Sequence, residues 1–243
     1  MTGECCVFCE GFLDRSFWKG WLLALGCSDP SNNGKNPVYD LSGERVAGGQ
    51  FAFISANKRF VRVVPVEGAS NLKKAVSAKL KDAVTRNIAS IIWNADVEDG
   101  PDQAAVEAVA RQAGYPISRR PDNLYEVQVD KRALSLGVVT WGCSDQEHRT
   151  LPSQQNLERL VCGAINHAYP ERGPLVRGWL DSRRIEQEPR PKAFAWSHMA
   201  GWYDDRGCDS FHQALWEDEL IRSALQDRLV ASGAWGTVES LIA

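Results

Sequence analysis

Three short apolar runs, each followed by an amphipathic stretch, dominate the first half of the sequence. The runs cover Glu4–Cys9, Phe60–Val66 and Ser90–Trp93, and each has the length of a buried strand. After the first run, apolar side chains recur with a helical period; they are Leu13, Phe17, Trp21 and Leu25, with Trp18 and Leu22 beside them. This alternation predicts a mostly parallel sheet with right-handed crossovers, and hence an α/β fold.

The connections between these runs carry turn and helix signals. Residues 28–58 are polar and rich in Gly and Asn, with room for a short hairpin around Gly49–Ala56. A second helix is expected to follow a cap at Asn71. A third helix is expected to have Pro101 in its first turn and to end near Gly114. The first half is therefore expected to alternate strand and helix three times.

Beyond Gly114 the pattern changes. Two further runs, Tyr125–Val129 and Leu136–Trp141, predict strands that could form an antiparallel edge pair. Prolines then separate four expected helices, over Pro152–Ala168, Pro174–Ile185, Pro191–Tyr203 and Phe211–Ala231. We expect an α/β core over residues 1–145, with a helical C-terminal portion over residues 146–243 packed on it.

Composition sets limits on partners. The 243 residues carry a net charge of −3 with a pI of about 5.9, so no global basic field attracts nucleic acid, and a nucleic-acid enzyme would need a local basic groove. The longest apolar stretch near the N-terminus, Phe12–Leu25, is interrupted by charges and too short to span a bilayer. No secretory signal is evident, so we expect a cytoplasmic protein without a membrane partner.

Cysteine usage argues against disulfide or zinc chemistry. The seven cysteines lack the regular spacing of a disulfide framework. Cys6 and Cys9 form a CxxC motif, but side chains three apart in a strand point to opposite faces, and no second pair completes four ligands. Buried free thiols are the favoured interpretation, and a metal or redox role is the alternative.

Acidic residues follow two of the predicted strands. Glu10 ends the first run, and Asp14 lies in the first turn of the helix after it, where the helix dipole favours a carboxylate. Because ligands of open α/β sheets bind at the carboxyl ends of strands, these residues are candidates for a site there. Carboxylate oxygens are preferred by Mg²⁺ and Mn²⁺.

The third run ends in a second acidic segment. Asn94 and Asp96 are two residues apart, so both are expected to reach one point above the sheet edge. Glu98 and Asp99 follow and could add a further ligand. The alternative is that these acids are caps and solvated loop residues. The pattern predicts a Mg²⁺ or Mn²⁺ site made by Glu10, Asp14, Asn94, Asp96 and Glu98.

Four motifs resemble those of TOPRIM domains, most closely the OLD-family nucleases and related stand-alone TOPRIM proteins. Cys9–Trp18 resembles the family's glutamate motif, and Ile91–Asp99 its Asp-x-Asp strand end. More weakly, Asn156–Leu160 resembles its helical Leu-Glu motif and Pro191–Ala193 its late lysine. The resemblance implies a TOPRIM-like sheet flanked by helices. It also implies a metal-ligand role for Glu158 and charge neutralisation by Lys192, although both could be ordinary solvated helix residues.

One position departs from the family pattern. The first aspartate of Asp-x-Asp is Asn94 here, and an amide oxygen can ligate a hard cation without contributing charge. Metal affinity should fall, and two-metal catalysis is put in doubt. On the same reasoning an aspartate at this position would be expected to raise metal affinity.

The resemblance implies a metal-dependent nuclease that acts on DNA or RNA. Catalysis would rest on Glu10 and Lys192, and a protein partner would supply recognition or ATP hydrolysis, since the chain has no Walker A motif. A role in bacterial anti-phage defence is implied by the resemblance alone. The alternative is a catalytically weakened TOPRIM-like module that binds nucleic acid or a partner protein without cutting. A nucleotide-binding regulator ranks last, because no phosphate-binding glycine loop is present.

Overall fold

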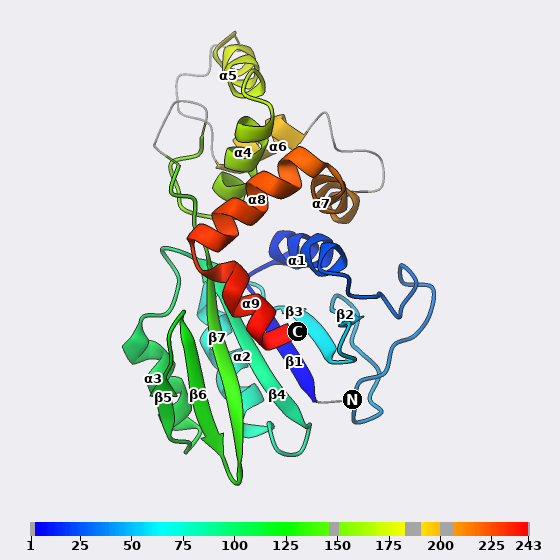
Figure 1. Cartoon of the computed structure of the whole chain (residues 1–243), viewed down its shortest axis with the longest axis vertical. Coiled ribbons are helices and arrows are strands. Elements are labelled where there is room, and N and C mark those ends of the chain that lie inside the picture. Colours follow the sequence, from blue (N-terminus) through cyan, green and yellow to red (C-terminus); the bar gives the residue numbers. More distant parts are fainter. Residues whose placement is uncertain (1–2, 146–150, 183–190, 200–206, 243) are drawn as a thin grey trace.

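The computed structural model describes residues 3–145, 151–182, 191–199 and 207–242, with only the backbone of Pro191, Lys192, Phe194, Met199 and Cys208. The described chain contains a seven-stranded sheet of order β2-β3-β1-β4-β7-β6-β5 (Figure 1). Its strands are β1 Glu4–Cys9, β2 Phe51–Ile54, β3 Phe60–Pro65, β4 Ile88–Asp96, β5 Ile117–Arg119, β6 Leu124–Val129 and β7 Arg132–Trp141. Strands β3, β1, β4 and β7 are parallel, and the edges are antiparallel.

This arrangement confirms the α/β fold expected from the alternation of apolar runs and helices. The helices of the first half are α1 Phe12–Ala24, α2 Ala69–Lys81 and α3 Gln103–Gln112. The cap predicted at Asn71 was wrong: α2 begins at Ala69, and the Asn71 amide instead donates hydrogen bonds to the carbonyls of Val66 and Glu67. Likewise Asp102, and not Pro101, marks the start of α3, by accepting a hydrogen bond from Ala105.

Helices cover both faces of the sheet. Along β1, Cys5, Val7 and Cys9 face one apolar core, and Cys6 and Phe8 face the other. The first core is closed by α1 and the C-terminal helices, and the second by α2 and α3. The CxxC thiols therefore lie on opposite faces, as strand alternation requires. Burial raises the pKa of both thiols, which keeps them protonated and poor metal ligands.

The helical C-terminal portion, apart from its last helix, lies over the carboxyl ends of the parallel strands (Figure 1). Its helices are α4 Leu157–Ala168, α5 Arg172–Ser182, α6 Pro191–Met199, α7 Cys208–Glu217, α8 Glu219–Ala231 and α9 Ala234–Ile242. The single helix expected to start at Phe211 is divided at Asp218, whose side chain caps α8. Helix α9, which was not expected, returns along β7 and β4. None of the described helices is long and apolar enough to cross a bilayer.

Buried ion pairs hold the long segment between α1 and β2 against the sheet. The Arg62 guanidinium bridges Glu4 at 2.8 Å and Asp40 at 2.6 Å, and these three side chains are almost fully buried. Arg86 joins them through Asp40, at 3.7 Å, and also pairs with Glu44 at 2.5 Å. A buried charge is tolerated when it is paired and hydrogen-bonded, so this network fixes a loop that has little secondary structure of its own.

Candidate metal centre

The parallel strands β1 and β4 are neighbours, and the helices that follow them cover opposite faces. Helix α1 packs in the first core and α3 in the second, so the chain leaves β1 and β4 in opposite directions. This is a topological switch point, where an open α/β sheet forms a crevice beyond the carboxyl ends of its strands. Glu10 directly follows β1, and Asp96 is the last residue of β4. Both acids therefore lie at the switch point.

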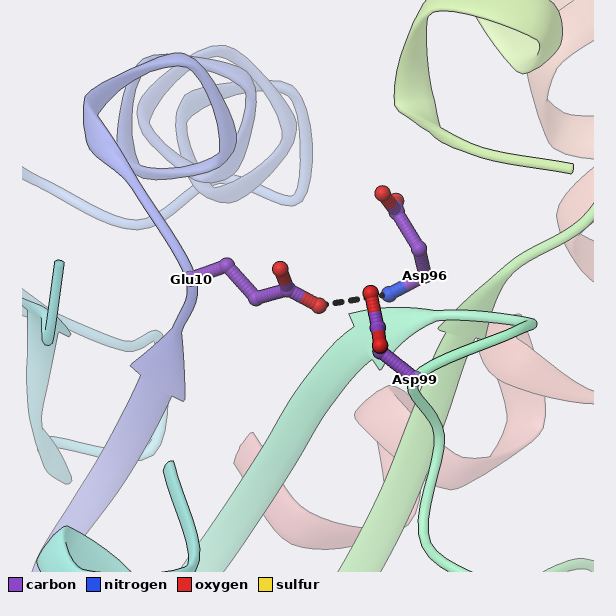
Figure 2. Close-up of side chains that lie close together, drawn as sticks. All are labelled: Glu10, Asp96 and Asp99. Atoms are coloured by element: carbon purple, nitrogen blue, oxygen red, sulfur yellow. Dashed lines mark hydrogen bonds between the residues drawn. The ribbon is translucent and has the colours of Figure 1, made fainter. Parts of the chain in front are cut away.

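Three carboxylates converge in this crevice. One oxygen each from Glu10, Asp96 and Asp99 lies within 4.8 Å of the others. Glu10 reaches across from the end of β1, and its Oε1 accepts a hydrogen bond of 3.1 Å from the backbone N–H of Asp96 (Figure 2). Asp99 is brought back toward Asp96 by a turn in which its N–H donates to the Asp96 carbonyl at 3.2 Å. A main-chain hydrogen bond and a tight turn thus set the positions of the cluster.

Asp14 contributes a fourth carboxylate from the first turn of α1. Its Oδ2 accepts from the backbone N–H of Gly11 at 2.9 Å, and its Oδ1 accepts from the Trp141 indole at 2.6 Å. Trp141 is fully buried at the end of β7, so it holds the carboxylate rigidly. Asp14 lines a cleft of about 390 Å³ together with Glu10, Asp96 and Glu158.

Helix α4 closes the cleft with its N-terminus. The backbone N–H of Leu157, its first residue, donates to Asp96 Oδ1 at 3.3 Å, and Asn156 caps the helix. Glu158 follows in the same turn and lines the cleft. The Gln155 carbonyl accepts from the N–H of Val97 at 3.1 Å, which ties the start of α4 to the end of β4. The Leu-Glu motif is thereby brought to the strand ends, 61 residues from Asp96.

Burial and mutual repulsion raise the pKa values of these acids. Burial raises the pKa of Asp96 to about 8, helped by the charges of Asp14, Glu10 and Glu158, against the hydrogen bond from Leu157. Burial likewise raises the pKa of Asp14 to about 6, although the hydrogen bonds from Trp141 and Gly11 oppose this. The pKa of Glu10 is raised by burial and by the charge of Asp99. Without a cation Asp96 therefore retains its proton near neutral pH.

These shifts predict that the metal-free protein loses stability as pH rises. Folded Asp96 keeps its proton up to about pH 8, whereas the unfolded chain releases it near pH 4, so the free energy of unfolding falls across this window. A bound divalent ion displaces the proton and stabilises only the folded state, so its effect should grow with pH. Thermal unfolding at about pH 5.5, 7 and 8.5, in chelator and in Mg²⁺, measures both effects. Asp96→Asn should flatten the chelator series, and an equally steep series in this variant would contradict the assignment.

Two of the expected ligands lie elsewhere. Asn94 is fully buried: its Oδ1 accepts from the Trp18 indole at 2.8 Å and its amide donates to the Val139 carbonyl at 3.1 Å. Glu98 is exposed in the turn after β4 and does not line the cleft; its neighbour Asp99 joins the cluster instead. Lys192 lies in the first turn of α6, which packs on α4, and its side chain is outside the described residues.

Sequence reasoning missed two contributors to the site. Trp141 was expected only as a strand residue, although its indole orients Asp14. The backbone N–H of Leu157 was also missed as a donor to Asp96. The helix-start signal of Asn156 followed by Leu157 and Glu158 could have indicated the second, because the free N–H groups of a helix start favour an anion. No local sequence signal indicates that the Trp141 indole orients Asp14.

The donor set fits a hard divalent cation. Ligand oxygens lie about 2.0–2.1 Å from Mg²⁺, so two ligands on opposite sides of the ion are about 4 Å apart. The Glu10, Asp96 and Asp99 oxygens all lie within 4.8 Å of one another, which is close to this spacing. Among the described residues that line the cleft, none is basic, so no side chain there offsets the carboxylates of Glu10, Asp14, Asp96 and Glu158. A cation would supply the missing charge and lower the pKa values of its ligands.

Comparisons with known proteins inform the fold. No protein-family model and no curated protein matches the sequence. A solved structure, the hypothetical protein PH0156 from Pyrococcus horikoshii OT3, superimposes with a TM-score of 0.74, over 99% of this chain and 100% of that one. The two sequences are 14% identical, so the likeness concerns the fold alone. The chain thus shares its α/β sheet and helical C-terminal portion with PH0156.

Proposed function

We propose that this protein is a metal-dependent nuclease of the TOPRIM type, which hydrolyses phosphodiester bonds in DNA or RNA with Mg²⁺ or Mn²⁺. The observation that carries the proposal is the convergence of Glu10, Asp96 and Asp99 at the switch point. Glu10 and Asp96 also share a cleft with Asp14 and Glu158. Motifs that are far apart in the sequence thus supply one oxygen-rich cleft. This arrangement suits an ion that must hold a phosphate.

The position of each residue suggests its role in the proposed reaction. Glu10, Asp96 and Asp99 would hold the ion, which when bound would polarise the phosphate and lower the pKa of a water. Asp14 is fixed by Trp141 and Gly11, so it can orient a proton or a further ligand without moving. Glu158 adds negative charge from α4. Lys192 is retained from the resemblance as the group that neutralises charge in the transition state.

Two further elements of the proposal rest on the resemblance alone. One is a protein partner that supplies recognition or ATP hydrolysis, and the other is a role in anti-phage defence. The acidic overall charge is consistent with a need for help in binding nucleic acid, because the chain has no global basic field. Neither element is required by the cluster, which would hold a cation in the isolated chain.

Cleavage by the purified chain tests the proposal. Labelled single-stranded and duplex DNA and RNA are incubated in Mn²⁺, in Mg²⁺ and in chelator, and Mn²⁺ binding is measured by calorimetry in parallel. We expect Mn²⁺ to bind and products to form only with metal. Binding of Mn²⁺ without cleavage of any substrate would favour the weakened binding module. Absence of Mn²⁺ binding would overturn the metal centre itself.

A further inference from the structure

An exposed aromatic ring borders the metal centre. Phe12 is the first residue of α1, two positions after Glu10, and it lines the same cleft. It is 50% exposed and belongs to neither apolar core, whereas the adjacent Leu13 packs against the first core. Helix formation does not require an aromatic residue here, because the capping hydrogen bond comes from Asp14. The ring is therefore available to a ligand at the cleft.

Neighbouring residues fix this ring in place. The guanidinium carbon of Arg15 lies 5.0 Å from the Phe12 ring centroid and 4.1 Å from that of Phe51. Arg15 is in turn held by a 2.8 Å hydrogen bond to the Gly49 carbonyl. A cation above an aromatic face stabilises the pair, most strongly where water is partly excluded. Arg15 is thus a positioning residue that presents Phe12 at the edge of the cleft.

The same face of α1 continues into a second hollow. Lys19, one turn beyond Arg15, places its ammonium 5.6 Å from the Phe51 ring centroid, and it lines a hollow of about 310 Å³ with Phe51. Lys19 is seven positions after Phe12 along the helix, a rise of about 10 Å. An aromatic ring at the metal centre and a cation further along the helix can follow one strand of nucleic acid.

The charge of the cleft favours single-stranded over duplex nucleic acid as the ligand. Duplex binding relies on many basic contacts to phosphates, but the described cleft lining has no basic side chain and the net charge of the chain is −3. Stacking on an aromatic ring needs an unpaired base and tolerates any base identity. An unpaired strand can stack a base on Phe12 and reach Lys19 with its backbone, whereas the stacked bases of a duplex cannot use the ring and the described cleft lining offers a duplex no row of basic contacts.

We propose that Phe12 is a base-stacking residue that selects single-stranded nucleic acid, with Lys19 meeting a flanking phosphate. A phosphate of the same strand would lie at the carboxylate cluster, and this part of the inference rests on the proposed function. Stacking does not require the 2′-hydroxyl, so DNA and RNA are both admitted by this surface. The chemical class of the ligand is an unpaired polynucleotide segment.

Fluorescence anisotropy tests the inference. Labelled twelve-nucleotide thymidine and uridine strands, and the matching DNA duplex, are titrated with wild type, Phe12→Ala, Phe12→Trp and Leu220→Ala in Ca²⁺ and in chelator. Leu220 is the control, because it is similarly exposed, at 57%, but lies on α8. We expect Phe12→Ala to weaken strand binding about tenfold or more, Phe12→Trp to retain it, and Leu220→Ala to leave it unchanged. The duplex should bind wild type at least about tenfold more weakly than the strands.

The outcomes separate this inference from the proposed nuclease. Equal affinities of Phe12→Ala and Leu220→Ala, equal binding of strand and duplex, or no strand binding by wild type would each overturn the inference, even if metal-dependent cleavage is observed. Strand binding that depends on Phe12 would support it, even in a protein that binds no Mn²⁺ and cleaves nothing. In that case the proposed nuclease function would be wrong, and the inferred single-strand binding surface would be supported. Circular dichroism confirms that each variant is folded.

Discussion

Replacing Glu10 by Gln should lower the rate of metal-dependent cleavage on the order of 10³-fold, because it removes one anion from the centre of the proposed metal site. The Gln side chain has the same shape, and its amide oxygen can still accept the hydrogen bond from the Asp96 N–H. The fold should therefore persist while the charge is lost. Single-turnover cleavage in Mn²⁺ measures the rate, and calorimetry measures Mn²⁺ affinity in the same preparation.

The turn after β4 provides a matched control for this substitution. Glu98 and Asp99 are adjacent acids, but only Asp99 reaches the cluster. We expect Asp99→Asn to lose Mn²⁺ affinity and Glu98→Gln to keep both affinity and rate within about twofold, as for a solvated surface charge. Cleavage by Glu10→Gln at the wild-type rate would contradict the proposed mechanism. A larger loss from Glu98→Gln than from Asp99→Asn would show that the cluster is assigned to the wrong acid.

Sequence periodicity was sufficient to predict the fold class and the strands that carry Glu10 and Asp96. Both predictions depend on local patterns, since an apolar run and a helical period each mark one element. The antiparallel pairing of β6 with β7 was also predicted from two adjacent runs, but their place at the edge was wrong, because the unpredicted β5 lies beyond β6 and β7 lies inside the sheet. What the pattern did not contain was the parallel pairing of β7 with β4, which brings Trp141 beside Asp96. A contact between residues so far apart depends on how the elements pack.

The choice between Glu98 and Asp99 shows a second limit. Both residues follow the same strand, and spacing alone does not distinguish them. The turn after β4 distinguishes them, because the Asp99 N–H donates to the Asp96 carbonyl and the Asp99 side chain is thereby brought toward Glu10. The alternation of side chains along a strand indicates only the face of the sheet on which a residue lies, and not its distance from the sheet edge. Asn94 and Asp96 are two residues apart, but Asn94 lies roughly 7 Å further back from the sheet edge, where α1 covers it.

The sequence led us to expect that an aspartate in place of Asn94 would raise metal affinity, and the buried position of Asn94 reverses this expectation. Its amide donates to the Val139 carbonyl, and a carboxylate oxygen in its place would face that carbonyl without a hydrogen to share. The other oxygen could still accept from the Trp18 indole. A carboxylate that is fully buried and only half satisfied is costly, whether it stays charged or takes up a proton, and a cation in the cleft cannot offset this cost because Asn94 does not line the cleft.

We therefore expect Asn94→Asp to lower the free energy of unfolding by about 3–5 kcal/mol, the range for an uncompensated buried charge, and to leave Mn²⁺ affinity unimproved. Urea unfolding and calorimetry with Mn²⁺ measure the two quantities. Asn36→Asp is the matched control, because Asn36 is exposed in the segment between α1 and β2, and its change should stay within about 0.5 kcal/mol. If Asn94→Asp instead folds as stably as wild type and binds Mn²⁺ more tightly, its side chain must reach the metal centre, and the division of β4 into a buried amide and a ligand carboxylate is wrong.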